Sequence, residues 1–512
     1  MVNILISGYY GFDNIGDESI LRTLVSSLRE HIPDCSLTVL SHNPASTREK
    51  YGVEAVDRMS PMAILREVKK CDMLISGGGS LLQDVTSSKS LHYYLSIIRC
   101  AEFFHKKVFI YSQGIGPIDR PGNRRAAAAA LKRADGIVVR DERSAALLEE
   151  IGIARDKVVI TADPVIRMKK PDGDVGAEIL RKAGVSLDGR LTVGWAIRER
   201  DTDSRFVKEL LRSIQMMKDK YNAQSVLIPF HYEEDGEVCR HIAAQLPDDT
   251  AVCLNEKYLS EDMLSIIGNM DLLVGVRLHS LIYAAIMGVP LIGISYDPKC
   301  TAFLNSVGLD KLSTKENFTA ELFLPEAERV LETGKEQVQC VEAHMAKLSR
   351  KLDTNEKMIC AIMEKSRKHT MQDPQNNTEK KDKSGVRTAG AISFVFLLTL
   401  FAKLLGVVRE MMQANIFGTG IDADLYTASY NSTLYLFTTM CYALCIAAVP
   451  ILTKEFAADR KRGEKAANNL MTITLLGSLA AVILWQVFAS TPLVGTIWDL
   501  DATELPRLAS YI

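Results

Sequence analysis

Arg277, His279 and Lys299 follow two apolar runs, 272–276 and 291–295, in the second half of the chain. The first run leads through Arg277 into a helical segment, so His279 stands at a helix start. Unpaired N–H groups at a helix N-terminus, with an arginine beside them, form a site for an anion. The helix end also lowers the pKa of a histidine, and a bound dianion raises it again, which allows proton transfer. This pattern predicts an acid–base histidine at an anion site; the alternatives are a capping histidine and a surface lysine.

Glycine-rich turns follow three apolar runs in the first part of the chain: residues 8–18, 77–80 and 112–117. Glycines after a strand let a ligand approach backbone N–H groups, although each turn can also be a plain tight turn. The spacing matches neither the dinucleotide-binding motif nor the P-loop. We therefore predict ligand-binding loops. The candidate substrate-binding residues are Gly11, Asn14, Gly77, Gly78, Gly79, Ser80, Gln83, Asp84 and Gln113.

Other polar side chains follow strand-like runs in the same way. Gln83 and Asp84, just after the triple glycine, either bind sugar hydroxyls or cap a helix. Arg140 directly follows the run 136–139, so it either makes a bidentate contact to a carboxylate or phosphate or pairs with an acid beside it, such as Asp141. Two further candidates for substrate binding are His231 and Asp297.

Apolar, β-branched runs alternate with helical segments over residues 1–170 and again over 190–368. This alternation predicts βαβ units and a parallel sheet in each half. We therefore expect an α/β fold of two domains, 1–170 and 190–368, the second ending in closing helices. Ligands of such folds bind beyond the carboxyl ends of the strands, so the candidate residues should meet in the cleft between the domains.

The overall composition excludes several classes of protein. The chain has 512 residues and a formal net charge of -2, whereas nucleic-acid-binding domains usually carry a basic excess. Its ten cysteines are too sparse for a disulfide scaffold and form no C-x-x-C pair. We see no cluster of metal-ligating residues and expect no metal. A strand-like run begins directly after Met1, so we expect no signal peptide.

The composition changes near the end of the second domain. Residues 369–387 are basic and almost free of apolar side chains, which predicts a flexible linker. Three apolar stretches follow, 389–408, 433–452 and 470–490, each long enough to cross a membrane as a helix. Basic residues before the first stretch and after the second favour a cytoplasmic position for the α/β part. Three buried helices of a soluble protein are the alternative.

Several of these motifs together resemble the polysaccharide pyruvyl transferase family, in particular its CsaB-type members. The resemblance covers residues 1 to about 330 and rests on the segments 8–18, 77–84, 112–117, 277–279 and 296–299. It implies two Rossmann-like halves arranged as in GT-B glycosyltransferases. It also implies an enzyme that moves the enolpyruvyl group of phosphoenolpyruvate onto a sugar as a cyclic ketal. CsaB-type members are similar to enzymes that modify N-acetylmannosamine in secondary cell-wall polysaccharides, which anchor S-layer proteins.

The resemblance further implies roles for the cationic residues. Phosphoenolpyruvate carries a carboxylate and a phosphate, so several cations should hold it, and we assign this role to Arg140, Arg277 and Lys299. We assign proton transfer to His279, starting with protonation of the methylene carbon. General acid–base catalysis contributes about 10²–10⁴-fold to a rate. Phosphoenolpyruvate is the donor substrate, and no cofactor is implied.

Residues 388–512 resemble the N-terminal part of the MurJ/MviN family of lipid flippases, through the segments 403–410, 416–420 and 448–450 and through Asp424. The resemblance implies that Lys403, Arg409 and Asp424 line a cavity for a lipid-linked pyrophosphate, although Lys403 can also snorkel to the membrane surface. The family has many more spans than three. This segment therefore either continues in a longer protein or serves only as an anchor.

Three functions fit these observations. The first is a pyruvyl transferase of the cell membrane, with several spans, whose enzymatic domain lies in the cytoplasm beside a lipid-linked saccharide acceptor. The second is a GT-B glycosyltransferase that uses a nucleotide sugar. The third is a fragment of a lipid-linked saccharide flippase with a regulatory α/β domain. We expect the first, with phosphoenolpyruvate, the saccharide acceptor and the membrane as partners and no nucleic acid.

Overall fold

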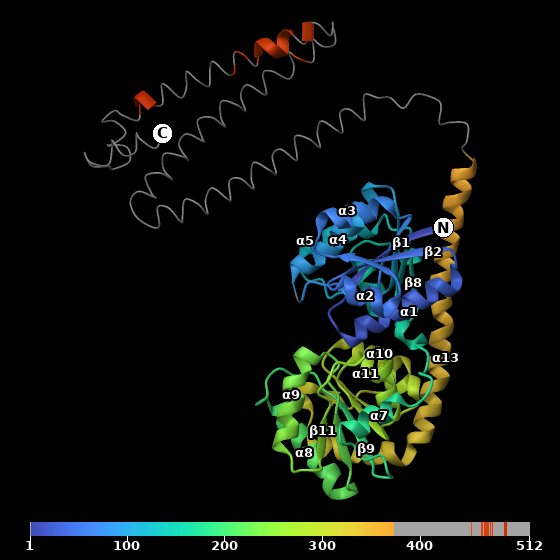
Figure 1. Cartoon of the computed structure of the whole chain (residues 1–512), viewed down its shortest axis with the longest axis vertical. Coiled ribbons are helices and arrows are strands. Elements are labelled where there is room, and N and C mark those ends of the chain that lie inside the picture. The colour runs from blue at the N-terminus through green and yellow to red at the C-terminus, as the bar shows by residue number, and fades with distance from the viewer. Residues whose placement is uncertain are drawn as a thin grey trace. The chain divides into compact units, whose positions relative to one another are not determined.

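The chain divides into two compact units, Met1–Pro374 and Gln375–Ile512. The structure, a computed structural model, describes residues 2–85, 87–372, 452, 462–463, 465–470, 472, 474 and 486–488. The first unit consists of two α/β lobes, and a long helix, α13 (Ala320–Gln372), runs along one side of both (Figure 1).

The N-terminal lobe is built on a parallel sheet with the strand order β3-β2-β1-β4-β6-β7-β8, and β5 pairs with β6. Its strands are β1 (Val2–Tyr10), β2 (Cys35–Ser41), β3 (Glu54–Asp57), β4 (Met73–Ser76), β5 (Gly79–Leu82), β6 (Lys107–Ile115), β7 (Gly136–Val139) and β8 (Val158–Ile160). Its helices are α1 (Ile15–His31), α2 (Pro44–Tyr51), α3 (Pro61–Lys70), α4 (Ser88–Phe103), α5 (Pro121–Leu131) and α6 (Glu142–Glu150), with short 3-10 turns η1 (Arg155–Lys157) and η2 (Pro164–Arg167).

The C-terminal lobe has a second parallel sheet with the order β11-β10-β9-β12-β13-β14. Its strands are β9 (Thr192–Ala196), β10 (Gln224–Leu227), β11 (Ala251–Cys253), β12 (Leu272–Gly275), β13 (Leu291–Ser295) and β14 (Ser313–Thr314). Its helices are α7 (Val175–Lys182), α8 (Arg205–Tyr221), α9 (Tyr232–Gln245), α10 (Ser260–Gly268), α11 (Leu278–Met287) and α12 (Pro298–Ser306), and η3 (Lys315–Asn317) precedes α13.

Burial explains why the apolar runs form strands. Every residue of β4, β7, β9, β12 and β13 is buried, as expected for parallel strands that helices cover on both faces. The predicted α/β fold with parallel sheets is therefore confirmed. The sequence analysis missed four short strands, β3, β5, β11 and β14, because two to four residues give too little periodicity. One of them, β5, begins at Gly79 inside the predicted glycine turn.

Side-chain caps set the starts of several helices at the edge of each sheet. Asn43, Ser60 and Asp297 each stand before a proline, and each side chain accepts a hydrogen bond from a backbone N–H in the first turn of α2, α3 or α12. Proline at the first helical position has its φ already set and lacks an N–H that would stay unpaired. The polypeptide therefore turns from strand to helix at defined positions, which places the loop side chains at the carboxyl ends of the strands.

Helix α13 connects the cores of the two lobes. Its first part packs Phe323 and Val330 into the C-terminal core, and its last part packs Ile359 into the N-terminal core. Between them lies Glu356, whose side chain is 2% exposed. Its carboxylate accepts hydrogen bonds from Ser27 Oγ (2.6 Å), Tyr111 OH (3.0 Å) and Arg167 Nη1 (3.4 Å). One buried acceptor thus joins the helix to the N-terminal lobe and to the segment between the lobes.

Glu356→Ala is expected to lower the melting temperature of the chain clearly. The substitution leaves three donors without their acceptor, and each unsatisfied buried donor costs about 1–3 kcal/mol. Thermal unfolding followed by circular dichroism measures the effect. Glu336, exposed on the same helix, provides the matched control, and Glu336→Ala should stay within about 0.5 kcal/mol of the wild type. Equal melting temperatures for the two variants would show that α13 does not depend on this acceptor.

Among the residues that the structure describes, no helix is long and apolar enough to cross a membrane. The apolar stretch predicted at 389–408, and most of those at 433–452 and 470–490, lie outside the described residues. The same holds for Lys403, Arg409 and Asp424, the three residues of the flippase-like cavity.

Candidate active site

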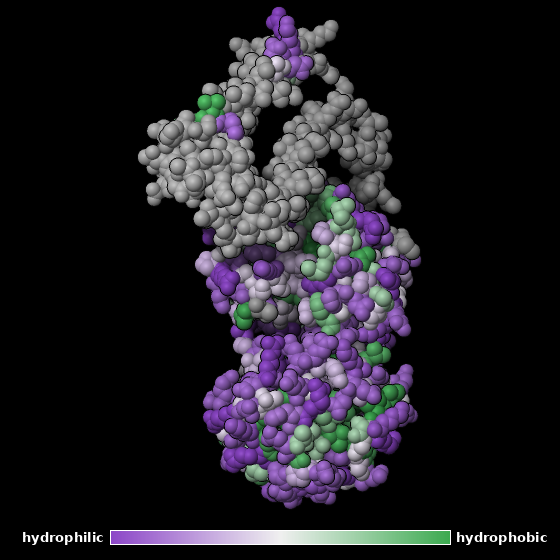
Figure 2. All heavy atoms as spheres, turned by 60° about the vertical axis from the view of Figure 1, so that its left-hand side comes forward, coloured by the Kyte–Doolittle hydropathy of each residue, from purple (hydrophilic) through white to green (hydrophobic). Residues whose placement is uncertain are grey.

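A cavity of about 950 Å³ lies between the two lobes, lined by residues from the carboxyl ends of strands in both sheets. Its volume suits a small-molecule substrate. Close to it, the lobes are joined by ion pairs between Arg22 and Glu261 (2.7 Å) and between Asp13 and Lys257 (3.4 Å). The surface around the junction of the lobes is mainly hydrophilic (Figure 2).

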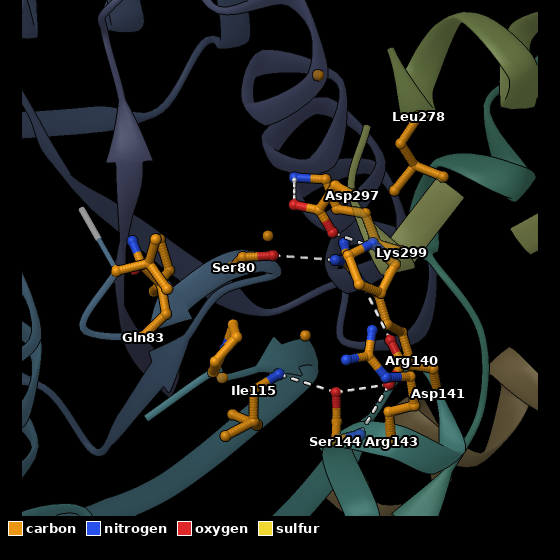
Figure 3. Close-up of a pocket in the computed structure, with 18 of the residues that line it drawn as sticks. Ser80, Gln83, Ile115, Arg140, Asp141, Arg143, Ser144, Leu278, Asp297 and Lys299 are labelled. Atoms are coloured by element: carbon orange, nitrogen blue, oxygen red, sulfur yellow. Dashed lines mark hydrogen bonds and ion pairs between the residues drawn. The ribbon is translucent and has the colours of Figure 1, made fainter. Parts of the chain in front are cut away.

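Ten of the fifteen predicted site residues of the α/β part line this cavity, in agreement with the convergence of parallel strands at their carboxyl ends. They are Asn14, Gly79, Ser80, Gln83, Arg140, His231, Arg277, His279, Asp297 and Lys299. Figure 3 shows Ser80, Arg140 and Asp141 from the N-terminal lobe and Asp297 and Lys299 from the C-terminal lobe around the same space.

Three of the ten also cap helices. Asn14 accepts hydrogen bonds from the first backbone N–H groups of α1, at 3.1 and 3.4 Å. His231 Nδ1 accepts a hydrogen bond from the backbone of Glu234 (3.2 Å) at the start of α9. Asp297 Oδ1 accepts one from the backbone of Lys299 (3.0 Å) at the start of α12. These side chains therefore position the cavity wall as well as facing the cavity.

The other five predicted residues do not line the cavity, and each has a structural role instead. Asp84 accepts hydrogen bonds from the backbone of Asp119 and Arg120 (both 3.0 Å). Gln113 is buried and donates to Ser76 Oγ and the Gly77 carbonyl. Tight packing explains the remaining glycines: an added Cβ would meet Tyr10 at Gly77, Ile20 at Gly78 and Ser41 at Gly11. Local sequence does not separate these roles from ligand binding, because the packing partners are remote.

His279 lies at the start of α11, and its imidazole rests against Gly16 of the N-terminal lobe. A Cβ added at Gly16 would overlap Nδ1 of the ring. The side chain is 17% exposed, and Nε2 lies 3.8 Å from Oδ2 of Asp163. Nε2 is buried and has no hydrogen-bond partner among the residues of the described part. The ring is therefore held by packing between the lobes, with one nitrogen unused.

Burial is the largest cause that lowers the pKa of His279, from 6.5 to about 4. The positive charges of Arg140, Lys299 and Arg277 lower it further, and the carboxylate of Asp163 offsets part of the shift. The imidazole is thus neutral near pH 7. The sequence argument expected a neutral ring from the helix end, whereas burial contributes most.

Arg140 is almost fully enclosed, with 6% of its side chain exposed. It donates to Ser80 Oγ (2.9 Å) and to Asp163 Oδ2 (3.1 Å), and its Nε lies 3.5 Å from Asp141. A Cβ added at Gly114 would lie 2.5 Å from the guanidinium. The ion pair with a neighbouring acid is therefore present, and Arg140 also lines the cavity.

The two cationic residues of the C-terminal lobe differ in their surroundings. Arg277 pairs with Asp235 (2.5 Å) and Glu234 (3.5 Å), and only 12% of its side chain is exposed. These two acids neutralise the charge of Arg277. The positive potential that Arg277 adds to the cavity is therefore weaker than the sequence suggested. Lys299 is 25% exposed and lies 3.5 Å from Asp297, so its ammonium is more accessible to a ligand.

The sequence analysis missed several residues that line or support the cavity, among them Asp17, Asp163 and Arg198. Asp17 stands in the glycine-rich turn that was singled out, and Arg198 and Asp163 follow β9 and β8 closely. Arg140 was predicted because it is a charged residue just after a strand. The same criterion also applies to Arg198 and Asp163. Arg198 donates a hydrogen bond to the hydroxyl of Tyr296.

Over the described ranges of the chain, no group of three or more His, Cys, Asp or Glu side chains is placed to hold a metal ion. The polar groups that line the cavity include the neutral imidazole of His279, several cations and several carboxylates. This set can bind a small anion and can transfer protons to and from it.

Residues 14–298 match the family described as Polysaccharide pyruvyl transferase. The chain is similar to the amylovoran biosynthesis protein AmsJ of Erwinia amylovora, with 21% identity over 370 residues, which cover 61% of this chain and 88% of AmsJ.

Solved structures are similar in fold alone. Anabaena Alr3699/HepE in complex with UDP-glucose has a TM-score of 0.51 and 11% identity, covering 71% of this chain and 100% of that one. A glycosyltransferase from Rickettsia africae has a TM-score of 0.50 and 12% identity, covering 70% and 98%. The α/β part therefore has a GT-B-like fold.

Proposed function

The chain belongs to the polysaccharide pyruvyl transferase family, and from this we propose that it transfers the enolpyruvyl group of phosphoenolpyruvate to a sugar of a cell-wall polysaccharide. The observation that carries this proposal is the interlobe cavity, in which the neutral imidazole of His279 lies among Arg140, Arg277 and Lys299. Such a site suits a small substrate with two anionic groups.

Two cationic residues from different lobes can hold the two anionic groups of the donor. Arg140 is fixed by Ser80 and Asp163, so its position is set before the substrate arrives. Lys299, the most exposed of the three cations, is available to the second group. Preorganised charges lower the cost of ordering side chains on binding. We assign carboxylate and phosphate binding to this pair, with Arg277 in support.

The reaction requires defined proton transfers. One proton must reach C3 of phosphoenolpyruvate to form the methyl group, and each of two sugar hydroxyls must lose a proton as its oxygen bonds to C2. Phosphate leaves and takes up the remaining proton. A neutral His279 is suited to accept the proton of an attacking hydroxyl, and it can return that proton to the departing phosphate.

We further propose that the acceptor is a saccharide linked to a membrane lipid and that the enzymatic part works at the cytoplasmic face of the cell membrane. The apolar stretches of residues 388–512 support this, because they are of spanning length in the sequence. Confining the enzyme to the surface that holds its acceptor raises the effective concentration of that acceptor. Under this proposal Lys403, Arg409 and Asp424 contact the lipid-linked pyrophosphate.

The test is phosphate release by the full chain, purified in mild detergent. Phosphoenolpyruvate is supplied with a synthetic lipid-linked saccharide that ends in N-acetylmannosamine. We expect phosphate only when both substrates are present, together with a product that carries one pyruvate ketal. UDP-glucose in place of phosphoenolpyruvate tests the glycosyltransferase alternative. Release of UDP, or phosphate release that does not depend on the saccharide, would refute the proposal.

A further inference from the structure

Asp17 places a carboxyl group in the cavity. It stands in the first turn of α1, and its side chain lines the cavity. Its Oδ1 lies 2.9 Å from where a Cβ on Gly79 would be, so the carboxyl group lies over the triple-glycine turn. Within the described part of the chain, no hydrogen bond or ion pair involves this carboxyl group. The neighbouring Glu18, by contrast, binds Tyr51 OH and the backbone N–H of Gly11.

The surroundings of Asp17 favour its protonated form. Burial is the largest cause that raises its pKa, from 3.8 to about 7, and the negative charge of Glu18 adds to the shift. The negative charge of Asp163 also raises this pKa, whereas the positive charges of Lys299 and Arg140 lower it. The negative charge of Asp17 in turn helps to raise the pKa of Tyr9, Tyr10 and Tyr94. Near pH 7 a substantial fraction of the molecules therefore carries a proton on Asp17.

Asp17 and His279 come from opposite lobes, and both line the cavity. The ring of His279 rests on Gly16, the residue that directly precedes Asp17. Between them they offer a carboxyl group able to give a proton and an imidazole able to take one. Acid–base catalysis needs two titratable groups whose pKa values are shifted in opposite directions, and this site has such a pair. The neutral imidazole of His279 is suited to accept a proton, and the carboxyl group of Asp17 is the better proton donor of the two.

Given the proposed function, we propose that Asp17 is the general acid that protonates C3 of phosphoenolpyruvate. The O–H bond of Asp17 breaks, the π electron pair of C2=C3 forms the new C–H bond, and C2 becomes an oxocarbenium centre. The first sugar hydroxyl bonds to C2 and gives its proton to His279. The C2–O bond to phosphate then breaks, and phosphate takes the proton from His279. The second hydroxyl closes the ketal and returns a proton to Asp17, so both residues regain their starting states.

The kinetic test compares the full chain with its Asp17→Asn and Asp17→Glu variants. We expect Asp17→Asn to lower kcat by about 10²–10⁴-fold. Its dissociation constant for phosphoenolpyruvate, measured by calorimetry, should change by less than about tenfold, since the cations that bind the anion remain. Asp17→Glu keeps the carboxyl group and should restore part of the loss. Asp34, exposed and remote from the cavity, is the matched control, and Asp34→Asn should leave kcat unchanged.

The pH profile separates an acid from a structural residue. Because the protonated form is required, wild-type kcat/KM should fall as the pH rises above about 7, and the residual activity of Asp17→Asn should lack this fall. A flat wild-type profile from pH 6 to pH 9, or near-normal turnover by Asp17→Asn, overturns the assignment. If the wild type itself releases no phosphate from phosphoenolpyruvate with the saccharide, the proposed function fails, and this role of Asp17 fails with it.

A stability measurement tests the carboxyl group without any substrate. Its pKa is higher in the folded chain than in the unfolded chain, so Asp17 contributes stability that is lost as the pH rises from about 4 to about 7. Asp17→Asn does not suffer this loss. The melting temperature of Asp17→Asn relative to the wild type should therefore increase between pH 4 and pH 7 and stay level above it. A constant difference over this range would show that Asp17 ionises normally, which overturns the inference even in an active enzyme.

Discussion

His279→Ala is expected to lower kcat for phosphate release by about 10²–10⁴-fold, which is the usual contribution of a general acid–base residue. The imidazole is neutral at pH 7, and its buried Nε2 has no hydrogen-bond partner among the described residues, so it is ready to accept a proton. The cations that hold the donor are not removed, and the affinity for phosphoenolpyruvate should change far less than kcat. Steady-state kinetics and titration calorimetry measure the two quantities separately.

Two further variants sharpen this experiment. His279→Gln keeps a hydrogen-bonding side chain of similar reach but cannot transfer a proton, so it should be nearly as slow as His279→Ala. His92 is exposed on α4, and His92→Ala should behave as the wild type. Because His279 is neutral above about pH 4, its ionisation should not reduce wild-type activity between pH 5 and pH 7. Near-normal turnover by His279→Ala would end the assignment.

Gly16→Ala is expected to reduce activity by about 100-fold, although the residue itself carries no reactive group. The added methyl group would overlap Nδ1 of His279, so either the ring turns away or the lobes separate at this point. A displacement of about 1 Å near the reacting atoms is enough for a loss of this size. Kinetics on the full chain, with its melting temperature as a check on folding, provide the measurement.

The chain offers a closely matched control for Gly16→Ala. Gly122 is also the second residue of a helix, α5, but a Cβ there meets no atom of the described residues within 4 Å. Gly122→Ala should keep full activity and gain up to about 1 kcal/mol, because alanine favours a helix over glycine. In the double variant with His279→Ala, the effect of Gly16→Ala on kcat should largely vanish, since both substitutions act on the same ring. Additive losses would mean that Gly16 acts through another contact.

These predictions rest on one proposal, in which each lobe contributes one of the two groups that transfer protons. Asp17 belongs to the first turn of α1, and His279 belongs to the first turn of α11. Burial raises the pKa of the carboxyl group and lowers that of the imidazole, because in both cases it disfavours the charged form. The same burial in the cavity therefore makes Asp17 a proton donor and His279 a proton acceptor.

Much of this site was predictable from local sequence. Alternating apolar runs and helical segments define parallel βαβ units, and the carboxyl ends of parallel strands share one edge of a sheet. Charged residues directly after a run must therefore lie at the carboxyl edge of their own sheet, Arg140 in the N-terminal lobe and Arg277 in the C-terminal lobe. This rule needs only the order of elements along the chain, and the structure places both residues at the cavity.

Only the tertiary structure decided what each polar side chain does there. Asp84 and Gln113 stand in glycine-rich segments like the binding residues, yet both hold the backbone of the N-terminal lobe. The enclosure of His279 by Gly16, the pairing of Arg140 with Asp163 and the raised pKa of Asp17 all join segments that are distant in sequence. Burial and charge pairing depend on which surfaces meet when the lobes pack. The sequence of each helix and strand determines which side chains are available. It does not determine the contacts between distant segments, and these contacts set the protonation states.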